Sequence, residues 1–218
     1  MPRAAPIAAL ALALVLVAAG CGGSSSSGGS TEATGGCEDV SAPAAREAGG
    51  GTAPTERLDP ERTWTLTFDT SCGTFVVTLD LDSAPATAAS LVSLARSGFY
   101  DDTVFHRIVP GFVIQGGDPT QTGTGGPGYS TVDAPASRAT YTKGVVAMAK
   151  TEDEPPGTAG SQFFVVTGDD ASLPPDYALV GKVTSGDDVV NRIAVVPRTA
   201  DDHPFDPIVI QKVRVAAS

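Results

Sequence analysis

The stretch that decides the fold is Phe105-His-Arg-Ile-Val-Pro-Gly-Phe-Val-Ile-Gln-Gly-Gly-Asp118. Two apolar runs flank Pro110-Gly111, a dipeptide typical of tight turns, so the stretch predicts a β-hairpin. In that hairpin Arg107 and Gln115 can project from the same sheet surface as some of the apolar side chains. A charged group in an apolar setting costs several kcal/mol unless it is paired. Arg107 is therefore either half of a structural ion pair or part of a functional site.

Short strands are predicted on both sides of this hairpin. Apolar and polar residues alternate over residues 63–69 and 74–79, which read as a second hairpin. The other strand candidates are Thr103–Val109, Phe112–Gly116, Val145–Ala149, Phe163–Val166, Leu179–Val183 and Pro207–Val215. Eight short strands separated by turn residues indicate a mainly β fold, either a sandwich or a closed barrel.

Two segments have the features of helices. In the first, Ser83 is placed to cap the helix, Pro85 suits its first turn, and an apolar stripe ends at Gly98. In the second, Gly186–Ile193, acidic residues occupy the first turn ahead of a short apolar face. We therefore expect two helices to accompany the strands.

The N-terminus has the features of an export signal. Arg3 precedes an apolar run over residues 4–19, which is short for a membrane-spanning helix. Ala18-Ala19-Gly20-Cys21 is similar to a bacterial lipobox, in which Cys21 becomes the lipidated first residue. We expect a signal peptide over residues 1–20 and an extracytoplasmic protein, lipid-anchored to the bacterial cell membrane. The alternative is an ordinary secreted protein.

Residues 21–57 are predicted to carry the lipid on Cys21 and to form a flexible tether. Eleven of the fifteen residues from Gly22 to Gly36 are Gly or Ser. Such a composition buries little apolar area and behaves as a coil. Gly49-Gly50-Gly51 and Pro54 continue this coil-forming composition toward residue 57. The folded domain is therefore expected over residues 58–218.

Cys37 and Cys72 remain when Cys21 is lipidated. Spare thiols outside the cytoplasm tend to pair. We expect a disulfide that joins part of the tether to the first hairpin, and the alternative is two free thiols. In the chain-entropy model the loop so closed adds about 3–4 kcal/mol of stability.

Composition limits the classes of function. The chain has 218 residues, with 14 Lys plus Arg, 25 Asp plus Glu and a formal net charge of −11. This balance repels phosphate backbones and argues against a nucleic-acid partner. Two His and three Cys leave few ligands for a metal site, so no metal is expected. One compact domain with a high net charge favours a monomer. Gly123–Gly128 fits a dinucleotide spacing, but Pro127-Gly128 opposes a helix start there.

The central stretch resembles the cyclophilin family of peptidyl-prolyl cis-trans isomerases. The matching motifs are Phe-His-Arg-Ile…Pro-Gly-Phe…Gln-Gly-Gly-Asp within 105–118, Gly160-Ser-Gln-Phe-Phe164, Gly123-Thr-Gly-Gly126 and Val180-Gly-Lys-Val183. The resemblance covers roughly residues 63–216. It implies a closed eight-stranded antiparallel β-barrel capped by two α-helices. It also implies an isomerase that rotates Xaa-Pro bonds of proline-containing polypeptides without a cofactor.

The same resemblance assigns roles to single residues. Arg107 looks like the catalytic arginine of the family. The residues implied to bind substrate are Phe112, Val113, Gln115, Ala149, Gln162, Phe164, Leu173 and Tyr177. Phe105 and Phe163 are interpreted as plain core, and His106 as structural.

The sequence departs from the family pattern at four of the positions compared. Val113 replaces the commoner Met, and Tyr177 stands where many members have His. Lys150 stands where Asn is frequent. Ser172 stands where a Trp often lies in forms that bind cyclosporin tightly, which leaves cyclosporin sensitivity open.

Two functions fit these observations. The first is a lipid-anchored isomerase that assists the folding of exported proteins. The alternative is a catalytically weak module that holds proline-containing segments at the cell surface, which the changes at Val113 and Tyr177 favour. A solute-binding lipoprotein is disfavoured, because the chain lacks the length and the alternating βα pattern of such proteins.

Overall fold

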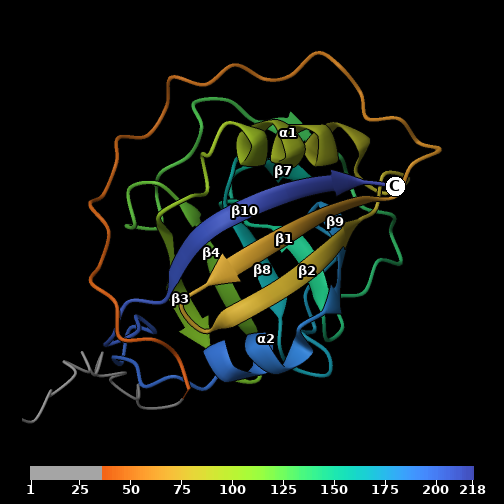
Figure 1. Ribbon diagram of the computed structural model, residues 1–218. Coiled ribbons are helices and arrows are strands. Elements are labelled where there is room, and N and C mark those ends of the chain that lie inside the picture. Colours follow the sequence, from red (N-terminus) through yellow and green to blue (C-terminus); the bar gives the residue numbers. More distant parts are fainter. Residues whose placement is uncertain (1–35) are drawn as a thin grey trace, which may run out of the picture. The chain divides into compact units, whose positions relative to one another are not determined.

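The computed structural model describes residues 36–218, so the predicted signal peptide and Cys21 lie outside the described residues. Eight antiparallel strands close into a barrel in the order β1-β10-β3-β4-β8-β6-β9-β2 (Figure 1). Their bounds are β1 (Trp64–Thr70), β2 (Gly73–Leu79), β3 (Thr103–Val109), β4 (Val113–Asp118), β6 (Val145–Met148), β8 (Phe163–Val166), β9 (Leu179–Ser185) and β10 (Val209–Ala217). The other elements are α1 (Pro85–Arg96), α2 (Asp187–Ile193) and a small sheet of β5 (Thr131–Val132) and β7 (Thr158–Ala159).

The interior of the barrel is filled from alternate strand positions. Along β1, buried and half-buried residues alternate, as the period of a strand requires. Phe68 of β1 stacks on Phe75 of β2, with ring centroids 4.8 Å apart. Phe105 and Phe163 meet edge to face at 6.1 Å, and each is 1% exposed. Both residues belong to the core, as the sequence predicted.

The architecture resolves the choice between sandwich and barrel in favour of the closed barrel. The strands predicted at Thr103–Val109 and Phe163–Val166 have the bounds of β3 and β8. The last strand was predicted two residues too early. Pro207 has no N–H to donate to a ladder, and the pairing of Trp64 with Ala217 carries β10 to the end of the barrel.

The start of α1 is capped differently from the prediction. Ser83 is not the cap, because the N-cap is Ala84 and makes no side-chain bond. The Ser83 hydroxyl donates instead to Asp80 Oδ2 at 2.7 Å. The carboxylate of Asp133, 46 residues along the chain, accepts from both the backbone N and the hydroxyl of Thr87 at 2.7 Å. A tertiary contact thus satisfies a free N–H of the first turn.

Residues 38–58, called the strap below, follow the outside of the barrel without regular secondary structure (Figure 1, orange trace). They come from the segment predicted as a tether, and the domain boundary at residue 58 stays a prediction. The Arg46 backbone N donates to Pro119 O at 2.8 Å, and the Gly49 N donates to Gly126 O at 2.8 Å. Backbone hydrogen bonds therefore hold the strap against the barrel loops.

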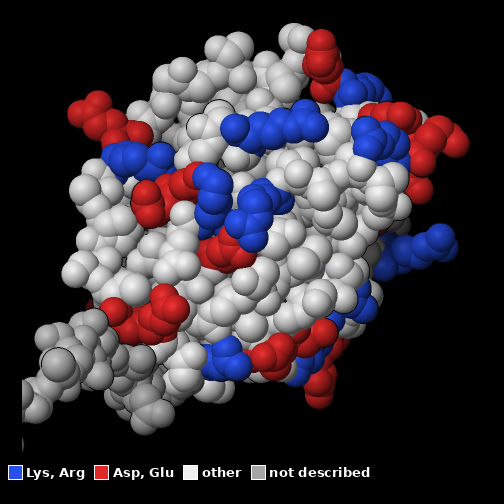
Figure 2. All heavy atoms as spheres, in the orientation of Figure 1, with Lys and Arg blue, Asp and Glu red and all other residues white. Residues whose placement is uncertain are grey.

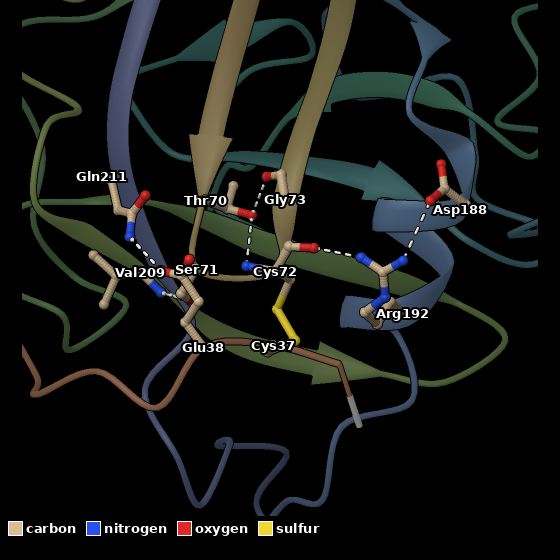
Figure 3. Close-up of a disulfide and its surroundings, with 10 residues drawn as sticks. All are labelled: Cys37, Glu38, Thr70, Ser71, Cys72, Gly73, Asp188, Arg192, Val209 and Gln211. Carbon is tan, nitrogen blue, oxygen red and sulfur yellow. Dashed lines mark hydrogen bonds and ion pairs between the residues drawn. A yellow bond between two sulfur atoms is a disulfide. The ribbon is translucent and has the colours of Figure 1, made fainter. Parts of the chain in front are cut away.

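A disulfide joins Cys37, the residue just before the strap, to Cys72 in the turn between β1 and β2 (Figure 3). Next to it, the backbone N of Glu38 donates to Ser71 O at 2.6 Å. Arg192 of α2 donates from Nη1 to Cys72 O at 2.5 Å. The strap, the first hairpin and α2 thus meet at one point of the barrel.

The face that carries β10, β1 and β2 presents charges of both signs side by side (Figure 2). Lys212 Nζ lies 2.7 Å from Asp101 Oδ2, and Arg214 pairs with Asp69. Exposed pairs of this kind contribute little to stability. Within residues 36–218, no helix is long and apolar enough to cross a membrane.

We expect the Cys37→Ser/Cys72→Ser double variant to lose about 3 kcal/mol of unfolding free energy. The reason is that the cross-link, 35 residues apart in sequence, no longer restricts the unfolded chain. Urea unfolding followed by the fluorescence of the single tryptophan, Trp64, measures the loss. Wild-type protein kept in a reducing agent is the matched control and should unfold like the variant. Equal midpoints for the oxidised and reduced wild-type protein would contradict the expectation.

Candidate active site

The hairpin of β3 and β4 places Arg107 and Gln115 side by side. The two residues are directly paired across the strands. Their neighbours Ile108 and Ile114 are fully buried and belong to the barrel core. Because successive side chains point to opposite faces, Arg107 and Gln115 lie on the outer surface. The turn between the strands contains Gly111 with φ of 69°, a conformation that glycine adopts at no steric cost.

A second, smaller apolar cluster covers the outer surface of β4, β8 and β6. Val113, Ala147 and Phe164 are at most 4% exposed, although they lie outside the barrel core. The chain between β8 and β9 returns over them and packs Leu173 and Tyr177 against the cluster. In the barrel order these strands lie opposite β10, β1 and β2, the strands in front in Figure 1.

A cavity of about 180 Å³ opens in this cluster. It is called the proline pocket below, because the resemblance to the cyclophilin family implies that residues of its lining hold the substrate's proline ring. Its lining residues are Arg107, Phe112, Val113, Gln115, Ala149, Lys150, Phe164, Leu173 and Tyr177. Pockets for drug-sized molecules usually measure ~300–1,000 Å³, so this one suits a single small ring. The structure thus gathers the predicted catalytic and substrate-binding residues into one cavity, with Gln162 outside it and Lys150 added.

Gln162 lines a second cavity of about 640 Å³, called the flanking cavity, which adjoins the first. The Gln115 side-chain amide donates to Gln162 Oε1 at 3.1 Å. Gln162 Nε2 in turn donates to the carbonyl oxygens of Gly123 and Gly125, each at 2.9 Å. Gln162 therefore fixes the orientation of the amide that faces the proline pocket.

Asp118 organises the glycine-rich loop that holds Gln162. Its carboxylate accepts hydrogen bonds from the backbone N of Thr120, Gly123 and Gly125 at 2.7, 2.7 and 3.1 Å. Burial alone would raise the pKa of Asp118, but these donors outweigh it and the pKa lies below the ordinary aspartate value. A Cβ on Gly125 would lie 2.1 Å from Asp118 Oδ1, so the turn requires glycine.

Two residues, Lys150 and Tyr141, contact Tyr177 and were not predicted as site residues from the sequence. Lys150, with a side chain 3% exposed, pairs with Asp176 at 2.6 Å, and its Nζ lies 5.6 Å from the centre of the Tyr177 ring. Tyr141 Oη donates to Tyr177 O at 2.6 Å and accepts from Tyr177 N at 3.0 Å. Lys150 was visible as a departure from the family pattern. Tyr141 had no local signal, because its partner is 36 residues away.

The Arg107 guanidinium is loosely held by the protein. Its side chain is 40% exposed, and Nε lies 3.9 Å from Asp202 Oδ2. Within the described residues, no hydrogen bond is donated by its side chain to another protein group. A guanidinium has five N–H donors in a planar fork. Those donors are therefore available to a ligand at the rim of the proline pocket.

His106 is buried beside the glycine-rich loop that contains Gly123, and it lines neither cavity. It is 5% exposed, and within the described chain neither ring nitrogen has a hydrogen-bond partner. Burial lowers the pKa of His106, and the charges of His203 and Arg107 lower it further, although Asp118 acts in the opposite direction. The ring is therefore neutral near pH 7. Residues 36–218 contain no group of three His, Cys, Asp or Glu placed to hold a metal ion.

Known proteins share this fold and much of this sequence. The family model described as cyclophilin type peptidyl-prolyl cis-trans isomerase/CLD matches residues 65–215. Peptidyl-prolyl cis-trans isomerase A of Mycobacterium tuberculosis is 37% identical over 175 residues, which cover 72% of this chain and 94% of that protein. Peptidyl-prolyl cis-trans isomerase-like 1 of Emericella nidulans is 37% identical over 154 residues, 69% of this chain and 93% of that protein. The crystal structure of a Cryptosporidium parvum cyclophilin type isomerase matches with a TM-score of 0.66 at 29% identity, covering 72% of this chain and 99% of that one.

The fold and the site define the structural class, a closed eight-stranded antiparallel β-barrel with a small pocket and a partly exposed arginine on its outer wall. The chain belongs to the cyclophilin family of peptidyl-prolyl cis-trans isomerases, enzymes of the EC 5.2.1.8 type.

We expect the unfolding free energy to fall as the pH drops below about 6.5, the ordinary histidine value. The folded-state pKa of His106 lies below its unfolded value, so the unfolded chain binds more protons in this range and is favoured by acid. Urea unfolding at pH 7.5 and 5.5 measures the change. His106→Phe should show a shallower dependence on pH over the same range, and an unchanged slope in that variant would assign the effect to another group.

Proposed function

We propose that this isomerase accelerates rotation about Xaa-Pro bonds of exported proteins, with Arg107 stabilising the twisted prolyl amide. The observation that carries the proposal is the position of Arg107 at the rim of the proline pocket, with its donors uncommitted. A Cryptosporidium parvum isomerase that is 30% identical was crystallised in the presence of the dipeptide ala-pro. That relative supports a proline-containing ligand for the pocket of this chain.

The chemical problem is a kinetic one. Resonance gives the peptide C–N bond partial double-bond character, and rotation costs roughly 18–20 kcal/mol. Before proline the cis and trans forms differ by only about 0.5–1 kcal/mol, so the enzyme needs to lower the barrier and not to drive the equilibrium. The difference between the planar and the twisted amide is therefore what the site must recognise.

Arg107 is suited to that recognition. When the amide twists, conjugation is lost and the nitrogen becomes pyramidal with a localised lone pair. A guanidinium N–H can donate to this nitrogen, and a second N–H can donate to a nearby carbonyl oxygen. Such donors bind the twisted state more strongly than either planar state, which lowers the barrier.

The walls of the proline pocket add to this effect. Phe112, Phe164 and Leu173 hold the proline ring against the outer cluster and exclude water from it. A hydrogen bond to the amide is stronger where the local dielectric is low. Gln115, oriented by Gln162, provides a second polar group at the same edge. Rotation thus occurs about the C–N bond while the proline ring on one side of that bond stays fixed in the pocket.

We expect Arg107→Ala to lower the rate of prolyl exchange at least about 100-fold, the scale for removing one transition-state donor. Arg107→Lys should restore little, because the planar fork is lost. NMR exchange spectroscopy on the purified protein with an Ala-Pro-containing peptide measures both binding and cis–trans exchange.

The matched control for this experiment is Arg214→Ala. Arg214 also projects from a barrel strand and pairs with an aspartate, but it lines neither cavity. Its loss should leave exchange unchanged. Unchanged turnover in Arg107→Ala would reject the mechanism. Peptide shifts without accelerated exchange in the wild-type protein would instead favour the alternative function, a proline-peptide binding module at the cell surface.

We further propose that the enzyme acts outside the cytoplasm, held at the bacterial membrane by a lipid on Cys21. The lipobox-like motif and the apolar run before it support this location. The disulfide between Cys37 and Cys72 supports it independently, because disulfides persist mainly in oxidising compartments. The clients are then exported chains that contain proline.

We expect the wild-type chain, produced in bacteria that process lipoproteins, to fractionate with membranes, and Cys21→Ser to move it to the soluble fraction. Stable membrane binding requires more than one acyl chain or a second membrane-binding signal. The substitution removes the thiol to which the lipid is attached. Intact mass measurement of the purified wild-type chain checks the modification directly. A soluble wild-type chain without added mass would indicate ordinary secretion.

A further inference from the structure

We infer that the strap is a specificity-determining wall of the active site, because Ala48 and Gly49 close one side of the flanking cavity. In this role the strap limits the size of the substrate side chain that enters next to the proline. The inference rests on the proposed function, since it treats the flanking cavity as the place of a residue near the proline in the bound chain.

The flanking cavity is continuous with the proline pocket. The two cavities share Gln115, Ala149 and Lys150 as lining residues. An extended peptide advances about 3.3 Å per residue. A chain with its proline in the smaller cavity therefore places a residue one or two positions away in the larger one. The substrate must pass the shared residues and then meets the strap.

The strap contacts the barrel closely enough to act as a fixed wall. The Gly49 N donates to Gly126 O and the Gly51 N to Pro127 O, both at 2.8 Å. A Cβ on Gly128 would lie 2.8 Å from the Gly49 Cα, and a Cβ on Gly51 would lie 2.6 Å from Pro127 O. Backbone thus packs directly on backbone, an approach that only glycine allows.

Side-chain contacts hold the strap before it reaches the cavity. Arg46 Nη2 donates to the carbonyl oxygens of Phe99 and Asp101 at 2.5 and 3.0 Å. Gln121 Nε2 donates to Pro43 O at 2.9 Å. The Cys37 disulfide fixes the start of the strap. A wall ordered in advance costs no ordering entropy when the substrate binds, so it can discriminate between substrates.

Size, more than charge, is the property that this wall can select. The strap contributes only a methyl group and a glycine to the cavity, and four of the eight lining residues between Gly123 and Ser130 are glycines. The one carboxylate of the lining, Glu154, already accepts hydrogen bonds from the backbone N and the hydroxyl of Thr151. The one cation of the lining, Lys150, is already paired with Asp176 at 2.6 Å. A bulky side chain therefore fits only as long as position 48 stays small.

The test compares wild type, Ala48→Leu and Ala45→Leu. Ala45 is exposed on the same strap and lines neither cavity, which makes it the matched control. Three Pro peptides are used, one with Ala at all flanking positions and two with Trp placed two residues before or two residues after the proline. We expect Ala48→Leu to lower the kcat/KM of one Trp peptide relative to the Ala peptide by about tenfold, the scale of added methylenes in a pocket. Ala45→Leu should keep the wild-type ratio.

An NMR titration provides a second readout that does not depend on turnover. The amide signals of Ala48 and Gly49 should shift with the affected Trp peptide more than with the Ala peptide. Unchanged kcat/KM ratios in Ala48→Leu, together with unshifted strap amides, overturn the inference while leaving the isomerase intact. Absence of Arg107-dependent exchange with the Ala peptide would overturn the proposed function, and the role of the strap with it.

Discussion

The antiparallel pairing of Arg107 with Gln115 across β3 and β4 is the constraint on which the site depends. In a strand, a slip of one residue would turn each side chain to the opposite face. Arg107 would then point into the barrel, and Ile108 would be exposed to water. Ile108 and Ile114 are fully buried, and the strand register that buries them also keeps Arg107 on the outer surface.

The same strands supply two apolar layers with different tasks. The inner layer, which includes Phe105 and Phe163, closes the barrel. The outer layer, which includes Val113 and Phe164, is smaller and leaves the proline pocket open. Tyr177 completes that layer from a loop, where Tyr141 hydrogen-bonds to its backbone and Lys150 Nζ lies 5.6 Å from the centre of its ring. Strands thus provide four of the nine lining residues of the pocket, and the turns and loops next to them provide the other five.

The strap shows how one composition serves two purposes. Gly49-Gly50-Gly51 reads in the sequence as part of a flexible tether, since glycine has the largest backbone freedom. In the structure, the first and last of these glycines donate backbone hydrogen bonds to the loop at 126–127. The missing side chain that makes glycine flexible also allows two backbones to touch. Sequence alone does not distinguish these uses.

The sequence by itself predicted the short strands and the central hairpin, because hydrophobic period and turn chemistry are local properties that a linear reading detects. The closed barrel and the residues that meet in the proline pocket were implied by the resemblance of its motifs to the cyclophilin family. Only the tertiary structure decided that Asp133 caps α1, that Tyr141 supports Tyr177, and that the strap borders the flanking cavity. These contacts join groups tens of residues apart. Their partners are set by the closure of the barrel, which no local pattern records.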